Sequence, residues 1–139
     1  TGIATFETKV PSFEVWNDKF IKKCRLVAEI NDQVIGFAVL SKVSKRKVYN
    51  GVAEVTVYIA QDESGKVFGK QLLEAFVYDS EKEGFWTLQA GIFSANKASI
   101  ELHKKCGFRV VGVREKIGKR DGKWHDNHFL ERRSIKVAN

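Results

Sequence analysis

The chain has 139 residues, of which 43% are hydrophobic and 29% charged, and its net charge is +7. This length and composition indicate one soluble globular domain. No apolar run approaches the roughly 18 residues that span a bilayer, and no signal-peptide pattern opens the chain. The two cysteines, Cys24 and Cys106, are expected to be reduced, packed thiols, so we predict a cytoplasmic protein. We expect no metal centre.

The positive charge suits nucleic acid, an anionic membrane surface or a phosphate-bearing cofactor. Basic residues are densest between residues 41 and 47, where the alternative interpretation is a solvated loop. The lysines are not interleaved with aromatic residues on one strand face, as single-strand nucleic-acid readers require. We therefore expect neither nucleic acid nor a membrane as partner.

The first predicted elements are a helix and a hairpin. After a short extended start, Ser12 caps a helix whose apolar residues recur at helical spacing. Residues 26–30 and 34–40 are predicted strands, joined by a turn at residues 31–32. The helix positions are Val15, Trp16, Phe20 and Ile21.

The middle of the chain alternates strands and helices. A third strand over residues 53–60 is rich in β-branched and aromatic residues. After a polar segment over residues 61–66, an apolar stripe from Phe68 to Gly84 predicts a helix. Residues 86–92 form the next strand.

The last predicted elements are a short helix and two strands. The helix covers residues 96–106 and stops at Gly107, a typical C-terminal glycine. Strands over residues 108–113 and 128–135 follow, joined by the glycine-rich, basic segment 118–124. The order indicates an α/β fold, a mixed sheet covered by helices.

Residues 55–70 combine a strand, a glycine-bearing polar loop and the start of a helix. Free N–H groups at a helix N-terminus, together with the helix dipole, form an anion site that pyrophosphate commonly occupies. Gly65 and Gly69 permit close approach, and Lys66 and Lys70 add charge. The alternative is an ordinary strand-to-helix turn.

Two further segments accompany this loop. Residues 96–108 open with Asn-Lys-Ala-Ser and close with Leu-His-Lys-Lys-Cys-Gly-Phe, and residues 122–126 are Gly-Lys-Trp-His-Asp. With residues 53–59 and the Thr-Phe-Glu-Thr of residues 5–8, they make the chain resemble the GNAT superfamily of N-acetyltransferases. The resemblance is closer to its phosphinothricin or methionine sulfoximine acetyltransferase branch, and it covers nearly the whole chain.

The resemblance implies a single N-acetyltransferase domain over residues 1–139, with a mostly antiparallel central sheet flanked by helices. The first strand and helix of the family would be absent, so we expect an N-terminally incomplete domain. It also implies acetyl-CoA as co-substrate, with its pantetheine arm along the third strand and its pyrophosphate in the glycine loop. The implied acetyl-CoA contacts are Val57, Tyr58, Ile59, Gly65, Lys66, Val67, Phe68, Gly69, Lys70, Asn96 and Lys105.

The loop departs from the family pattern at Ser64 and Val67, where glycine is usual. A β-branched residue does not readily adopt positive φ, so the departure predicts weaker acetyl-CoA binding. An alternative hypothesis follows, namely a non-catalytic or weakened CoA-binding or protein-interaction module of the same fold.

Two residues are predicted to be catalytic. Glu54 matches the family's acidic position and would deprotonate the amine through water. On a strand it shares a face with Thr56 and Tyr58, and its alternative role is that of a surface glutamate. His103 stands where its branch favours histidine, and imidazole would protonate the departing thiolate or help to deprotonate the amine. A purely structural role is the alternative for His103.

The acceptor is predicted to be the primary amine of a small amino-acid-like molecule, such as phosphinothricin or methionine sulfoximine. A peptide N-terminus or a polyamine-like amine is the alternative acceptor. The branch usually forms homodimers, to which Phe129 and Leu130 would contribute. The expected acceptor contacts are Lys47, Tyr49, Trp124 and His125.

Overall fold

The structure, a computed structural model, describes residues 2–4, 20–30, 32–60 and 63–138. The helix predicted to begin at Ser12 therefore lies largely outside the described residues. Phe20 and Ile21, expected on that helix, are not helical, and the Ile21 N–H donates to the Leu40 carbonyl at 2.7 Å. The prediction is wrong for these two positions.

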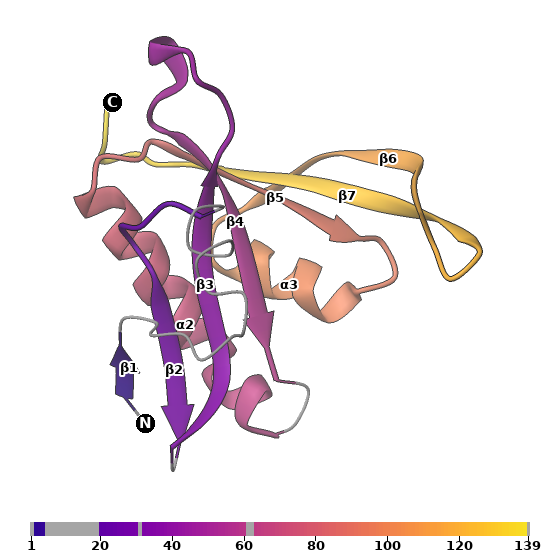
Figure 1. The fold of residues 1–139 in the computed structure, drawn as a ribbon, viewed down its shortest axis with the longest axis horizontal. Helices are drawn as coiled ribbons and strands as arrows, with labels where there is room; N and C mark the ends of the chain where they lie inside the picture. The colour runs from indigo at the N-terminus through magenta and orange to yellow at the C-terminus, as the bar shows by residue number, and fades with distance from the viewer. Residues whose placement is uncertain (1, 5–19, 31, 61–62, 139) are drawn as a thin grey trace.

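Among the described residues, seven strands form one sheet in the order β1-β2-β3-β4-β5-β7-β6 (Figure 1). Every neighbouring pair is antiparallel except β4 and β5, which are parallel. This confirms the mixed, mostly antiparallel sheet. The strands are β1 (Gly2–Ala4), β2 (Leu26–Ile30), β3 (Gln33–Lys42), β4 (Val52–Ile59), β5 (Thr87–Phe93), β6 (Arg109–Arg120) and β7 (Lys123–Arg133).

Two helices of the described chain, α2 (Glu63–Lys82) and α3 (Lys97–Lys105), pack on one face of the sheet. Helical spacing places apolar side chains of α2 on one stripe, while period-two alternation places every second strand residue beneath it. Glycine at positive φ follows each helix, at Gly84 and Gly107, as the sequence predicts. The fully buried side chains include Ala38, Leu40, Ala53, Leu73, Phe76 and Leu130.

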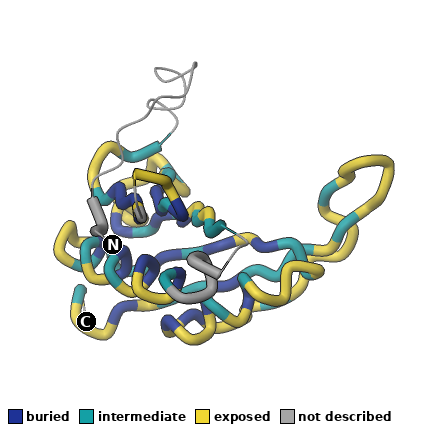
Figure 2. The backbone as a smooth tube through the Cα atoms, turned by 90° about the horizontal axis from the view of Figure 1, so that it is seen from below, coloured by how far each residue is buried: buried dark blue, intermediate teal, exposed yellow. Residues whose placement is uncertain are grey.

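The hairpin of β6 and β7 is longer than predicted. The sequence predicts a connecting segment over residues 118–124, but both strands continue to a two-residue turn at Asp121 and Gly122. Their φ values of 53° and 76° are both positive, which is the signature of a type I′ turn and favours Asp-Gly. The hairpin end extends away from the rest of the sheet (Figure 1) and is largely exposed (Figure 2).

Cys24 and Cys106 are free thiols, as predicted. Burial, followed by the charges of Asp79 and Glu83, raises the pKa of the Cys24 thiol to about 12, so it stays protonated. No helix within the described residues is both long and apolar enough to cross a membrane. A cytoplasmic location stays a prediction.

Candidate active site

The parallel strands β4 and β5 are joined over three register pairs, the last of which is Glu54 with Gln89. Beyond it, β4 runs on to Ile59 beside β3, and β5 runs on to Phe93 beside β7. The two strands therefore separate, and we call this opening the fork. Along residues 55–59, the edge of β4 that faces away from β3 has no described strand beside it. Its backbone groups are available to an extended ligand.

Glu54 lies at the base of the fork, on the sheet face opposite α2 and α3. Ala53 and Val55 are 0% and 5% exposed, so alternation places Glu54 and Thr56 on the other face, as predicted. Gln89 Nε2 donates a hydrogen bond to Glu54 Oε1 at 3.1 Å. Within the described chain, Oε2 of Glu54 has no hydrogen-bond partner, so it can accept a proton or a water.

The sequence predicts a phosphate-binding loop from Gly65 to Lys70, but these residues are helical because α2 begins at Glu63. A glycine in a helix interior costs only about 1 kcal/mol, and packing of the apolar stripe outweighs this cost. Val67 lies in regular helix, where a β-branched residue needs no positive φ. The predicted penalty of Val67 on acetyl-CoA binding therefore loses its basis.

The N-terminus of α2 still has the properties of an anion site. The first N–H groups of a helix lack an intrahelical acceptor, and in α2 they include those of residues 63–65. Gly65 is thus at the terminus, whereas Lys66 and the residues after it donate within the helix. Only residues 60–62 separate this terminus from the end of β4.

Gly69 and Phe68 face the protein rather than a ligand. A Cβ at Gly69 would lie 3.4 Å from Ile59 and 3.6 Å from Leu102, so the glycine lets α2 approach β4 and α3. Phe68 and Ile59 both pack against the core, while Lys70 is exposed. The side chain of Phe68 is thus used in packing, and a role of Phe68 and Gly69 in acetyl-CoA binding stays a prediction.

Beyond the fork, the side chains of β4 point to both faces. Val57, like Ile59, is partly buried against the core. Tyr58 is 50% exposed, and its ring stacks on Phe37 with centroids 5.6 Å apart. A ligand on the Glu54 face can therefore contact Val57 and Ile59 through their backbone but not through their side chains.

Asn96 and His103 hold different positions on α3. Asn96 is the N-cap residue, and its Oδ1 accepts the Ser99 N–H at 3.2 Å. His103 is 3% exposed, with Nδ1 2.7 Å from the Ser99 carbonyl and its ring edge-on to Phe108 at 5.0 Å. Since a carbonyl only accepts, Nδ1 carries the proton. Glu54 and His103 share no hydrogen bond in the described structure.

Burial lowers the pKa of His103, although its bond to the Ser99 carbonyl acts in the opposite direction. The imidazole is therefore neutral near pH 7, with its proton on Nδ1 and Nε2 as an acceptor. A neutral ring in this state can accept a proton but has none on Nε2 to donate.

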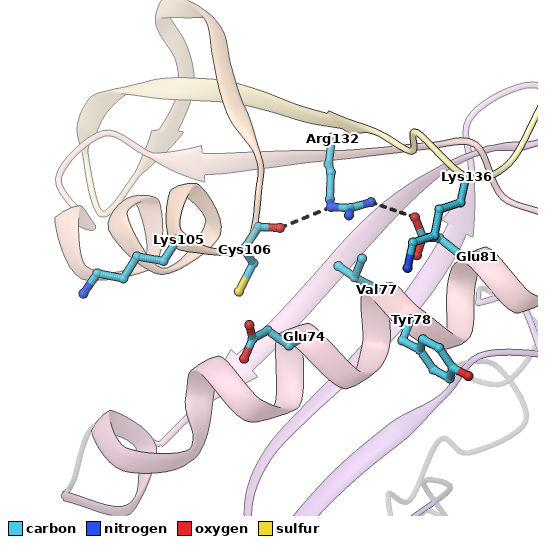
Figure 3. A pocket seen from close by; sticks show the side chains of 8 residues that line it. All are labelled: Glu74, Val77, Tyr78, Glu81, Lys105, Cys106, Arg132 and Lys136. Atoms are coloured by element: carbon cyan, nitrogen blue, oxygen red, sulfur yellow. Dashed lines mark hydrogen bonds and ion pairs between the residues drawn. The ribbon is translucent and has the colours of Figure 1, made fainter. Parts of the chain in front are cut away.

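A hollow of about 340 Å³ lies between α2, the end of α3 and the end of β7 (Figure 3). Arg132 crosses it, donating to the Cys106 carbonyl at 3.2 Å and to Glu81 at 3.3 Å. Lys105, a predicted phosphate contact, is at its rim and extends away from these groups (Figure 3). The hollow includes neither Glu54 nor His103, so it is separate from the fork.

Lys47 and Tyr49 lie on the connection between β3 and β4, in a short 3-10 helix (Lys47–Tyr49). Both are exposed, and the Arg46 guanidinium lies 5.9 Å from the Tyr49 ring centroid. This connection precedes Glu54 in the chain, whereas the fork opens after it. A role in acceptor binding stays a prediction for both residues.

His125 and Trp124, the two predicted acceptor contacts on β7, lie at different distances from the fork. His125 stacks on Phe93, with centroids 5.1 Å apart, and Phe93 is the last residue of β5 at the fork. Trp124 is 59% exposed beside the turn, under the Lys119 ammonium at 5.7 Å. Seven residues separate it from Glu131, the β7 partner of Gln89, or about 23 Å of strand.

Sequence reasoning missed Gln89 and Phe93. The signal for Phe93 is its strand-end position beside the polar segment that follows, but nothing local marks Gln89. The guanidinium of Arg120 lies 5.8 Å from the Phe93 ring, on which His125 also stacks. Leu130, predicted at a dimer interface, is 0% exposed because it points to the helices; that prediction is wrong.

Comparisons with known proteins show the family of this chain. Residues 3–129 match the family described as "Acetyltransferase (GNAT) domain". L-methionine sulfoximine/L-methionine sulfone acetyltransferase of Pseudomonas paraeruginosa is 33% identical over 99 residues, covering 71% of this chain and 58% of that protein. Phosphinothricin N-acetyltransferase of Alcaligenes faecalis is 32% identical over 138 residues, covering 95% and 70%.

A solved structure is also similar. A GNAT superfamily phosphinothricin acetyltransferase of Sinorhizobium meliloti, in complex with acetyl-CoA, has a TM-score of 0.73 and 31% identity. The match covers 82% of this chain and 62% of that one. The chain belongs to the GNAT acetyltransferase family, which confirms the predicted family and fold. It spans 58% of the length of the Pseudomonas relative.

Proposed function

We propose that the chain transfers an acetyl group from acetyl-CoA to the primary amine of a small amino-acid-like molecule. The observation that carries the proposal is the fork, with a carboxylate at its base and a helix N-terminus at its open end. Phosphinothricin and methionine sulfoximine are the proposed acceptors, because proteins that act on them are about a third identical to this chain.

The residues present suit acetyl-CoA. The open edge of β4 over residues 55–59 can pair with the amides of an extended arm, as an added strand would. The N–H groups of residues 63–65 and the charge of Lys66 suit a pyrophosphate. Asn96 retains its Nδ2 for a ligand, since only Oδ1 is used in capping. When bound, acetyl-CoA would supply the acetyl group as an activated thioester.

Glu54 has the position of the general base. Oε2 accepts a proton from the acceptor's ammonium, directly or through one water, and so frees the amine lone pair. N–H groups on the open edge of β4 stabilise the negative charge that develops on the carbonyl oxygen. As the N–C bond forms and the C–S bond breaks, the amine's second proton goes to the thiolate, through water.

His103 has a different role in this proposal. Because its Nε2 has no proton near pH 7, it does not act as the acid toward the thiolate. Its packing on Phe108 instead fixes α3 and hence Asn96 at the helix start. This is the structural alternative that the sequence left open.

We also propose a homodimer formed through β6. Val111, Val113 and Ile117 are 46%, 50% and 51% exposed on this edge strand, which is unusual for aliphatic residues. Size-exclusion chromatography with light scattering tests it, and a monomeric mass at micromolar concentration would contradict it.

The proposed activity is tested by thiol release from acetyl-CoA with a panel of small amino-acid analogues. We expect acceptor-dependent release that falls about 100-fold in Glu54→Gln, since the base is lost while shape is kept. Glu131→Gln is the matched control, a second carboxylate on the same face, and it should retain activity. No release with any amine, together with no acetyl-CoA binding, would favour the non-catalytic module.

A further inference from the structure

Five polar side chains form a row across the open face of the sheet. Register pairs place them on neighbouring strands, from β3 through β4, β5 and β7 to β6. The central residue, Gln89, is paired with Glu54 on one side and with Glu131 on the other. Because adjacent strands are about 4.8 Å apart, both carboxylates are within reach of its amide. The row consists of Ser41, Glu54, Gln89, Glu131 and Arg109.

The two carboxylates beside Gln89 have different partners. Glu131 accepts from Arg109 at 2.6 Å, so its charge is already compensated. Among the described residues, Glu54 has no ion-pair partner. Its one hydrogen bond is accepted from Gln89 Nε2 at 3.1 Å. The Gln89 amide is therefore committed to Glu54.

We propose that Gln89 is a positioning residue, whose amide fixes the Glu54 carboxylate across the base of the fork and leaves Oε2 for the amine. This inference rests on the proposed function of Glu54. Gln89 belongs to the last rung before β4 and β5 separate, so its hydrogen bond joins the two strands at the point where the backbone ladder ends.

The chemistry of an amide suits this task. A glutamate side chain has several rotamers, and a fixed hydrogen bond removes the entropy cost of selecting one during the reaction. A neutral donor holds the ionised carboxylate, whereas a cation in the same place would strongly reduce its basicity. Gln89 is itself held, because β5 is paired on both sides at this rung.

The test replaces Gln89 by Met, which keeps the length of the side chain but cannot donate. In Gln89→Met we expect kcat to fall about 5- to 10-fold while KM for acetyl-CoA is unchanged. Thr87→Val, on the same face of β5 two rungs earlier, is the matched control and should change neither quantity.

A second measurement does not depend on turnover. The chemical shift of the Glu54 carboxyl carbon at pH 7 can be followed by NMR in ¹³C-glutamate-labelled protein, assigned with Glu54→Gln. A signal that moves in Gln89→Met and in Gln89→Leu supports the positioning contact even if the wild type acetylates no amine, in which case only the proposed function fails. A Glu54 signal that stays unchanged in both variants would overturn the inference.

Discussion

The body of the protein and the end of its last hairpin are built on different principles. In the body, β2 to β5 enclose a core with α2 and α3, where Phe76 and Leu73 are 0% exposed. In the hairpin end, residues 113–124, Val113 and Ile117 are about half exposed. In the described structure that end pairs as two antiparallel strands, with Arg120 also lying 5.8 Å from the Phe93 ring of β5. Most of its residues are exposed (Figure 2). The difference shows that burial fixes the body, while turn chemistry and cross-strand pairs fix the hairpin end.

The largest difference is expected from truncation of aromatic side chains. Phe76→Ala should lower the free energy of unfolding by about 3–5 kcal/mol, since it removes a fully buried ring and leaves a cavity. Trp124→Ala in the hairpin end, outside the proposed β6 interface, should change it by less than about 1 kcal/mol, since its ring is 59% exposed. Urea denaturation followed by circular dichroism measures both. Equal losses of unfolding free energy in the two variants would contradict the distinction between a packed body and an exposed hairpin end.

A smaller effect is expected at Glu81, which ties α2 to the end of β7. It accepts from Ser134 at 2.7 Å and from Arg132 at 3.3 Å. Burial alone would raise the pKa of Glu81, but these hydrogen bonds and the nearby charges outweigh it and lower the pKa. Glu81→Gln should therefore cost about 1–3 kcal/mol at pH 7.

The sign of the pH dependence follows from the lowered pKa. The stabilisation by Glu81 is complete above its ordinary value of 4.5 and is lost as the pH falls through the folded value. The difference between wild type and Glu81→Gln should therefore shrink as the pH falls below 4.5, as urea titrations at each pH would show. Glu101→Gln, which breaks an exposed pair with Lys104, should cost under about 0.5 kcal/mol at every pH. A constant Glu81 difference would refute the assignment.

The smallest change in stability is expected from replacing either of two glycines by alanine. Gly69→Ala should stabilise the protein by about 0.5–1 kcal/mol, because a Cβ there has ordinary contacts and improves helix propensity. Gly107→Ala should destabilise it by about 1 kcal/mol, since φ is +94° and a Cβ would lie 3.1 Å from Arg132. Thermal unfolding measures both. A loss of stability in Gly69→Ala would instead favour the predicted loop conformation for residues 65–70.

The sequence predicted those parts of the fold that local patterns determine. Alternation identified β4 and the outward side of Glu54, and Gly107 marked the end of α3. The start of α2 was missed because Gly65 and its polar neighbours are typical of a loop, and only packing of the later turns favours helix there. Gln89 was missed because its contact with Glu54 joins positions 35 residues apart and depends on strand register. Residue types alone do not encode that register.

Three backbone rungs are the only strand pairing between β1–β4 and β5–β7 in the described sheet. A ligand that hydrogen-bonds along the open edge of β4 and also contacts β5 or α3 would add contacts between these two groups of strands. Such a ligand binds only the folded sheet, so its binding free energy adds to the free energy of unfolding. The resistance of the protein to heat and proteolysis would therefore rise with the concentration of that ligand.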